Sequence, residues 1–198
     1  MASTMYEEIE QLKEQGRLEE ALIVANRLLV KDPKDKEALF QVADIEYRRG
    51  EIGRAEKPID FLLEWATEDA MGYYIKGILE MEKTNRKKAR DFFKRSLQLM
   101  NEENPEILRC YGLCEYWLGN REDGMDYLQR AYEANTLDAE IILNLIEIAI
   151  LEEQRAVAKK YIASYQSNKA SIQFFDRPAS YYDKKIALFS EYIESYLP

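Results

Sequence analysis

Residues 69–93 read DAMGYYIKGILEMEKTNRKKARDFF, and this stretch carries the pattern that decides the fold. Asp69 precedes an apolar helical stretch, where its side chain can accept hydrogen bonds from the first N–H groups of a helix. Gly77 and Ala89 are small residues on two successive helical stretches, and such residues let two helices approach closely. The chain has only 8 glycines and 5 prolines, which favours helix throughout.

The same pattern recurs along most of the chain with a period of about 34 residues. Small residues share one phase at Ala21, Ala55, Ala89, Gly124 and Ala158. Asp or Asn precedes a helical stretch at Asp35, Asp69, Asn104 and Asp138. Both series contain one extra residue at the same place, between the third and fourth repeats. The period predicts repeats at about 2–35, 36–69, 70–103, 105–138 and 139–172, each made of two short helices.

Glycine and proline indicate where helices end or deviate. Gly16, Gly50 and Gly119 stand five residues before the small residue of their repeats, where a left-handed residue can close the first helix. Pro58 lies inside the expected second helix of the second repeat, and a mid-helix proline costs about 3 kcal/mol. We therefore expect this helix either to begin late, with Pro58 in its first turn, or to bend.

The third repeat carries the clearest family signature. Tyr73, Lys76 and Gly77 are followed by Ala89 and Phe93, and this spacing resembles that of the tetratricopeptide repeat family, whose unit is a helix–turn–helix. The fourth repeat offers the same phase in Leu108, Tyr111, Gly112, Gly124 and Leu128. The resemblance implies an all-α fold, a right-handed α-solenoid of about five helix pairs within residues 1–172.

Residues 173–198 predict a loop followed by a C-terminal capping helix. Apolar side chains of this segment recur at three- and four-residue spacing on one stripe: Tyr182, Ile186, Phe189, Ile193 and Tyr196. A terminal repeat lacks one neighbour, so we expect this helix to cover the exposed face of the fifth pair.

Composition excludes several classes of function. The chain has no histidine, which removes His-based acid–base chemistry and most zinc sites. Its 37 acidic residues against 28 basic ones give a net charge of −9, which disfavours nucleic acid as a partner. No phosphate loop or nucleophile motif is present, so we expect no catalytic, cofactor-binding or metal-binding residues and no enzyme activity. We expect no signal peptide, no membrane insertion and a cytoplasmic location.

The family resemblance implies a binding site on the first helices of the pairs. Proteins of this family are similar in using these helices to line a concave groove for a peptide or helix. The expected groove residues are Phe40, Asp44, Tyr47, Tyr74, Ile78, Met81, Arg109, Leu113, Tyr116, Trp117, Leu143, Asn144 and Glu147. An exposed apolar and aromatic strip favours an apolar or basic-amphipathic segment of a partner protein. The alternatives are that these side chains pack between neighbouring helices, or that the C-terminal helix fills the groove.

The resulting functional prediction is a protein–protein interaction module, acting as an adaptor, scaffold or chaperone. Two alternatives remain open: a self-associating structural module that forms a homo-oligomer, and a chaperone similar to the small repeat chaperones of bacterial secretion systems.

Two further features have a structural and a functional interpretation. Cys110 and Cys114 share a helix face, and buried packing is favoured over a metal or redox pair because no histidine or further cysteine is available. Residues 83–95 carry seven basic side chains against one acidic one. A solvated convex face is favoured over a docking site for an acidic partner.

Overall fold

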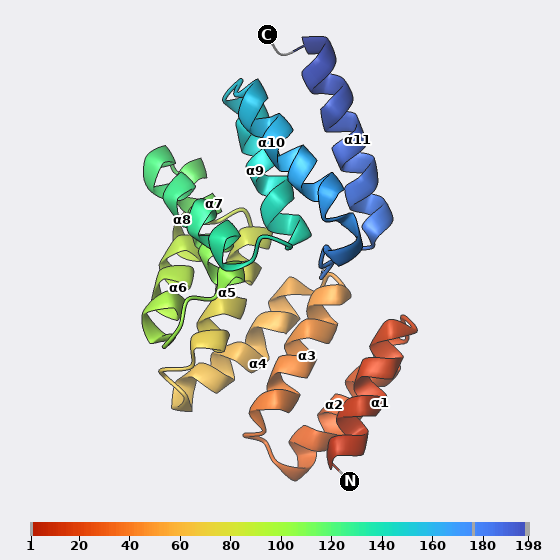
Figure 1. Ribbon diagram of the computed structural model, residues 1–198. Coiled ribbons are helices and arrows are strands. Elements are labelled where there is room, and N and C mark those ends of the chain that lie inside the picture. The colour runs from red at the N-terminus through yellow and green to blue at the C-terminus, as the bar shows by residue number, and fades with distance from the viewer. Residues whose placement is uncertain (1, 176, 197–198) are drawn as a thin grey trace. The chain divides into compact units, whose positions relative to one another are not determined.

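The computed structural model describes residues 2–175 and 177–196 and is helical over nearly all of them (Figure 1). The α-helices within these ranges are α1 (Ala2–Glu14), α2 (Leu18–Lys31), α3 (Lys36–Arg48), α4 (Ile52–Trp65), α5 (Ala70–Glu82), α6 (Arg86–Leu99), α7 (Pro105–Trp117), α8 (Arg121–Ala134), α9 (Ala139–Leu151), α10 (Arg155–Ser167) and α11 (Ala179–Tyr196). A short 3-10 helix, Lys169–Ser171, follows α10.

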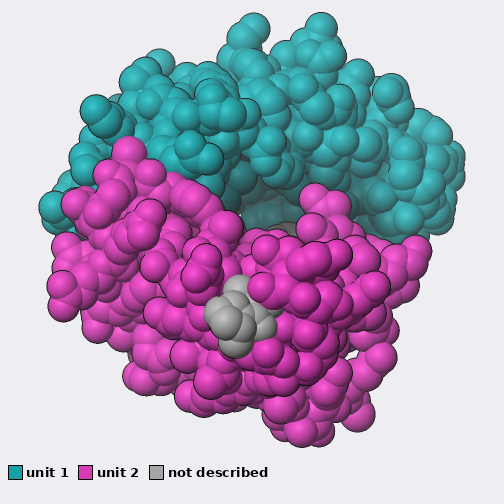
Figure 2. Space-filling model, turned by 90° about the horizontal axis from the view of Figure 1, so that it is seen from above, with its two compact units in different colours: residues 1–101 teal, residues 102–198 magenta. Residues whose placement is uncertain are grey.

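The helices form two compact units, residues 1–101 and 102–198, which Figure 2 colours separately. In the first, unit 1, α1 packs against α2, α3 against α4 and α5 against α6, and each pair also contacts the next. In the second, unit 2, α7 packs against α8 and α9 against α10. The all-α architecture of stacked helix pairs expected from the period is therefore confirmed.

The predicted N-caps begin the first helices of the second to fifth pairs. Asp35 accepts a hydrogen bond from the backbone N–H of Ala38, and Asp69 accepts one from Gly72. Asn104 and Asp138 each accept two, from the N–H groups two and three residues ahead. These bonds satisfy donors that the helix itself leaves unpaired, at a gain of about 0.5–2 kcal/mol per cap.

A left-handed residue closes the first helix of every pair. Gly16, Gly50 and Gly119 have φ of 72°, 75° and 100°. Thr84 and Glu153 occupy the same phase in the third and fifth pairs, with φ of 59° and 56°. In all five turns the next residue donates its N–H to the carbonyl five residues earlier, at 2.8–3.0 Å. The turn geometry is therefore common to all repeats, although only three of them have glycine at this position.

Side chains of complementary size fill the centre of each pair. In the third pair Gly77 faces the ring of the fully buried Phe93, and in the fourth Gly112 faces Leu128. The five pairs combine Ile9 with Ala25, Ala43 with Ile59, Gly77 with Phe93, Gly112 with Leu128 and Ile146 with Ile162. In the first four, a larger residue on one helix accompanies a smaller one on the other, which keeps the buried volume filled.

Pro58 does not mark a late helix start. Helix α4 begins at Ile52, and Pro58 is a buried residue in its middle. The prediction of a late start was wrong because the turn at Gly50 determines where α4 begins, independently of the proline.

Helix α11 caps the fifth pair, since it packs against both α9 and α10 (Figure 1). Tyr182, Ile186 and Ile193 are buried, as the predicted stripe requires, and Phe189 is half-buried. Tyr196 departs from the prediction because its side chain is 74% exposed. The loop before α11 is tied to unit 2 through Gln173, whose N–H donates to the carbonyl of Leu137.

Candidate functional site

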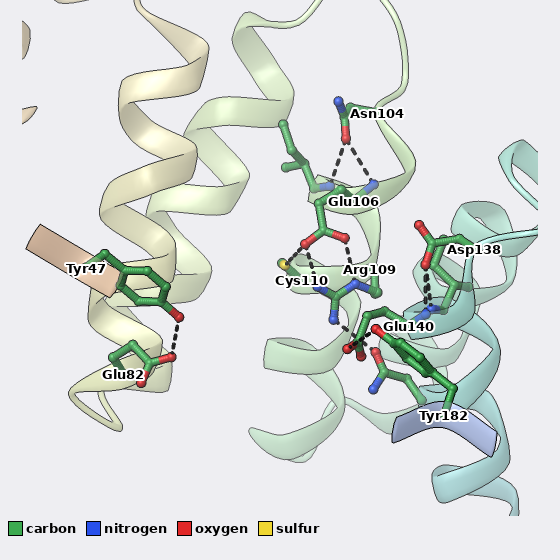
Figure 3. Close-up of polar contacts among 12 residues, drawn as sticks. Tyr47, Glu82, Asn104, Glu106, Arg109, Cys110, Asp138, Glu140 and Tyr182 are labelled. Atoms are coloured by element: carbon green, nitrogen blue, oxygen red, sulfur yellow. Dashed lines mark hydrogen bonds and ion pairs between the residues drawn. The ribbon is translucent and has the colours of Figure 1, made fainter. Parts of the chain in front are cut away.

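In unit 1, the first helices α1, α3 and α5 are linked by side chains on one face. Lys13 of α1 reaches Asp44 of α3 at 2.6 Å and the amide oxygen of Gln41 at 2.9 Å. The hydroxyl of Tyr47 on α3 donates to Glu82 of α5 at 2.8 Å (Figure 3). We call this surface, which also carries Phe40, Tyr74, Ile78 and Met81, the first-helix face of unit 1.

The predicted groove residues of unit 1 all lie on this face. Phe40, Asp44 and Tyr47 recur at four- and three-residue spacing along α3, as Tyr74, Ile78 and Met81 do along α5. All six side chains are half-buried. Tyr74 also packs on α6, where its ring centroid lies 6.0 Å from that of Phe93.

The charge of this face is predominantly negative. Asp44 is neutralised by Lys13 and by Arg48, whose guanidinium lies 3.0 Å away. Glu37 and Glu82 are exposed and accept hydrogen bonds from Gln41 and Tyr47, and no ion pair involves either of them within the described residues. Glu10 is half-exposed and shares the ammonium of Lys13 with Asp44. Acidic groups therefore flank a partly exposed apolar strip.

In unit 2, several of the predicted groove residues join neighbouring helices. Arg109 of α7 forms a bidentate ion pair with Glu106 and donates to Asn144 of α9 at 3.1 Å (Figure 3). Tyr116 donates its hydroxyl to Glu152 at the end of α9. Arg109, Tyr116 and Leu143 are only 9%, 4% and 3% exposed. These side chains stabilise helix stacking and present little surface to a partner.

The remaining groove positions of unit 2 differ in exposure. Leu113 and Asn144 are half-buried, and Trp117 is exposed at the end of α7. Glu147 is half-buried, and burial raises the pKa of its carboxyl, while the charge of Lys185 on α11 opposes the shift. Leu113 and Trp117 are therefore the apolar groove positions of unit 2 that stay accessible.

The buried polar cluster of unit 2 includes the thiol of Cys110. Cys110 lies 3.4 Å from a carboxylate oxygen of Glu106. Burial raises the pKa of the Cys110 thiol well above its usual value, with Arg109 opposing the shift. Both cysteines are buried, as expected for packing. No group of three or more metal-ligating side chains is found among the described residues.

Two bonds between first helices recur at equivalent positions, and sequence analysis missed their carboxylate partners. Tyr47 and Tyr116 stand at the same phase of their repeats, and each donates to a glutamate near the end of the next first helix. The signal was present, because Glu82 and Glu152 follow these tyrosines by 35 and 36 residues, which is close to one period.

The comparisons with known proteins agree with this architecture. No family model matches the chain, and no curated protein matches it in sequence. TTC0263, a thermophilic TPR protein of Thermus thermophilus, matches with a TM-score of 0.77 and 19% identity, covering 96% of this chain and 100% of that one. PilW, described as a widely conserved type IV pilus biogenesis factor, matches with a TM-score of 0.76 and 16% identity over 99% and 93% of the two chains.

A third solved structure adds a described function. YrrB, a TPR protein with an unusual peptide-binding site, matches with a TM-score of 0.61 and 21% identity over 87% of this chain and 84% of that one. These matches show that the chain has the tetratricopeptide-repeat fold. None of the described helices has the length and apolar character needed to cross a bilayer.

Proposed function

We propose that the chain is a non-enzymatic protein–protein interaction module, an adaptor, scaffold or chaperone that binds a peptide or helix of a partner on the first-helix face of unit 1. The observation that carries this proposal is the partly exposed strip of Phe40, Tyr74, Ile78 and Met81. Aromatic side chains and methionine suit a binding surface because they bury much area and adapt their shape to a partner.

The charge of the face favours a particular partner chemistry. Glu10, Glu37 and Glu82 lie beside the apolar strip, and the cations Lys13 and Arg48 are already paired with Asp44. A segment with apolar anchors and flanking Lys or Arg residues therefore complements the face in both polarity and charge. An acidic partner tail is disfavoured because Lys13 and Arg48 of this face are already engaged by Asp44.

The fold match to YrrB supports a peptide ligand by analogy only, because fold does not determine function. Leu113 and Trp117 offer a second, smaller accessible apolar surface in unit 2, where Asn144 and Glu147 would contribute polar contacts. The cytoplasmic location remains a prediction from the sequence.

A random peptide library displayed on phage tests the proposal. We expect the wild-type protein to enrich peptides that combine apolar residues with Lys or Arg. For an enriched peptide, Ile78→Asp and Glu37→Lys should each weaken binding by roughly tenfold, since one places a charge in the apolar strip and the other removes a complementary charge. Glu37 is exposed but accepts a hydrogen bond from Gln41 at 3.0 Å, so circular dichroism of both variants checks that the fold is retained.

The matched control is Val30→Asp, which adds the same charge at an exposed apolar residue of the second helix α2. It should leave binding unchanged. Enrichment of acidic peptides, or equal losses in the Ile78 and Val30 variants, would show that the partner binds elsewhere.

A further inference from the structure

The outer face of α11 carries an exposed aromatic and apolar stripe. Leu188, Tyr192 and Tyr196 are 61%, 45% and 74% exposed, and they follow one another at four-residue spacing on one side of the helix. Tyr181, half-buried and seven residues before Leu188, extends the stripe toward the start of the helix. The rings of Tyr192 and Tyr196 contact each other, with centroids 5.3 Å apart.

This stripe lies beside the face that α11 packs onto unit 2, roughly 100° around the helix, since Tyr181 and Tyr192 each precede a buried residue of that face by one position. Tyr182, Ile186 and Ile193 are buried there, so α11 is apolar on two sides. A helix whose apolar surface extends beyond the face that it packs is typical of a helix with a further neighbour. Counted from the first residue of each helix, Tyr181 and Leu188 match Ile141 and Ile148 of α9, which are 0% and 2% exposed. In α11 Leu188 remains exposed, whereas Tyr181 is half-buried, with the guanidinium of Arg177 4.7 Å from its ring centroid.

Charges along the stripe lie on either side of Leu188. Lys184 and Glu191 are seven residues apart on the same side of α11, one before Leu188 and one after it. Both are exposed, and neither forms an ion pair with a described residue. Glu194, by contrast, is bound by Arg155 and Lys159 of α10 and belongs to the packed side of the helix.

We propose that α11 pairs antiparallel with α11 of a second copy of this chain, about a two-fold axis that passes beside Leu188. Antiparallel pairing about this axis brings Lys184 of each copy opposite Glu191 of the other, and it covers the stripes of both helices. Parallel pairing would place like charges against each other and is disfavoured. The charge arrangement thus selects a second copy as the occupant, in one orientation.

The size of the surface determines the strength of the pairing. A helix of this length is about 27 Å long, so one helix pair buries less area than the roughly 1,200 Å² of a stable interface. We expect a weak dimer whose population rises with protein concentration. The proposal is independent of peptide binding because it uses no residue of unit 1.

Sedimentation equilibrium over a wide concentration range tests the pairing. The wild-type chain should show a monomer–dimer equilibrium, and Leu188→Glu should weaken it by at least tenfold because it places two carboxylates at the axis. Val30→Glu, an equivalent change at an exposed apolar residue of α2, should leave the equilibrium unchanged. Circular dichroism of each variant checks that the fold is retained.

Charge exchange distinguishes this orientation from every other dimer. Lys184→Glu alone and Glu191→Lys alone should each weaken the homodimer by roughly tenfold, since both ion pairs become repulsive. A mixture of these two variants should form a heterodimer, because every Lys then faces a Glu across the axis. A wild-type chain that stays monomeric at all concentrations would overturn the proposal. So would a dimer that Leu188→Glu does not weaken, or a mixture that forms no heterodimer.

Discussion

Gly77→Ala tests whether helix spacing within a pair is determined by contacts between residues of complementary size. A Cβ atom built on Gly77 of α5 would lie 2.4, 2.5 and 2.8 Å from three ring carbons of Phe93 on α6. Ordinary carbon contacts begin at about 3.5 Å, so the ring or the helix must move by about 1 Å. Phe93 is fully buried, which leaves its ring no open space to enter.

The expected cost follows from two opposing terms. Overpacking a well-filled core costs about 1–3 kcal/mol, whereas replacing glycine by alanine within a helix gains up to about 1 kcal/mol. We therefore expect Gly77→Ala to lower the free energy of unfolding by about 1–2 kcal/mol. Gly53→Ala is the matched control, because Gly53 lies in the first turn of α4 with nothing within 4 Å of its Cβ position. The control should be stabilising by about 0.4–1 kcal/mol.

Urea unfolding followed by far-UV circular dichroism measures both variants. A Gly77→Ala protein as stable as the Gly53→Ala protein would refute the reasoning, since it would mean that α5 and α6 adjust at no cost. The two variants should change the free energy of unfolding in opposite directions. This contrast is informative because the chemical change is identical and both glycines lie in helices of unit 1.

A second substitution identifies the contact responsible. The second pair combines Ala43 with Ile59, and both side chains are buried, so alanine is accommodated where the opposite residue is isoleucine. Phe93→Ile should therefore remove much of the cost of Gly77→Ala, with a coupling free energy of about 1 kcal/mol or more. Strictly additive effects of the two substitutions would show that the ring is not the obstacle.

Three further predictions concern the turn, a buried carboxyl and the thiols. Thr84→Gly should raise the thermal unfolding midpoint, with a gain of about 0.5–1 kcal/mol, because Thr84 is held at positive φ; an unchanged or lower midpoint would contradict this. Glu147→Gln should increase stability at neutral pH and lose this advantage in acid. Burial raises the pKa of the Glu147 carboxyl in the folded state, so the folding stability of the wild type falls as pH rises through that pKa. Urea unfolding at two pH values measures the difference, and an advantage that persists in acid would refute this cause. Cys110 and Cys114 should react with a thiol reagent only when the chain unfolds, since both are buried; rapid labelling of the native protein would show that this part of unit 2 opens readily.

The sequence predicted best those features that depend on local interactions. The caps at Asp35, Asp69, Asn104 and Asp138 are confirmed because each side chain bonds N–H groups only two or three residues ahead. The turns were predicted only where glycine marked them. Thr84 and Glu153 adopt the same conformation without that marker, because the packing of the two helices imposes the turn on residues that do not favour it.

Candidate site residues were harder to assign, because exposure depends on neighbours about one repeat away. Arg109 and Leu113 both had the spacing of groove residues on α7. Arg109 is buried between Glu106 and Asn144, whereas Leu113 stays partly accessible. Spacing along a helix identifies a shared face, but it does not tell which members of that face are used in stacking.

The sequence alone determined that this protein consists of helix pairs of one length and where each pair begins. These features follow from hydrogen bonds within a turn and from a hydrophobic period, and both are local. Only the tertiary structure decided which polar side chains bridge successive first helices, and which apolar stripes stay exposed once α11 is packed. The physical reason is that the burial of a side chain depends on its neighbours in space, and those neighbours are about 35 residues distant in the chain.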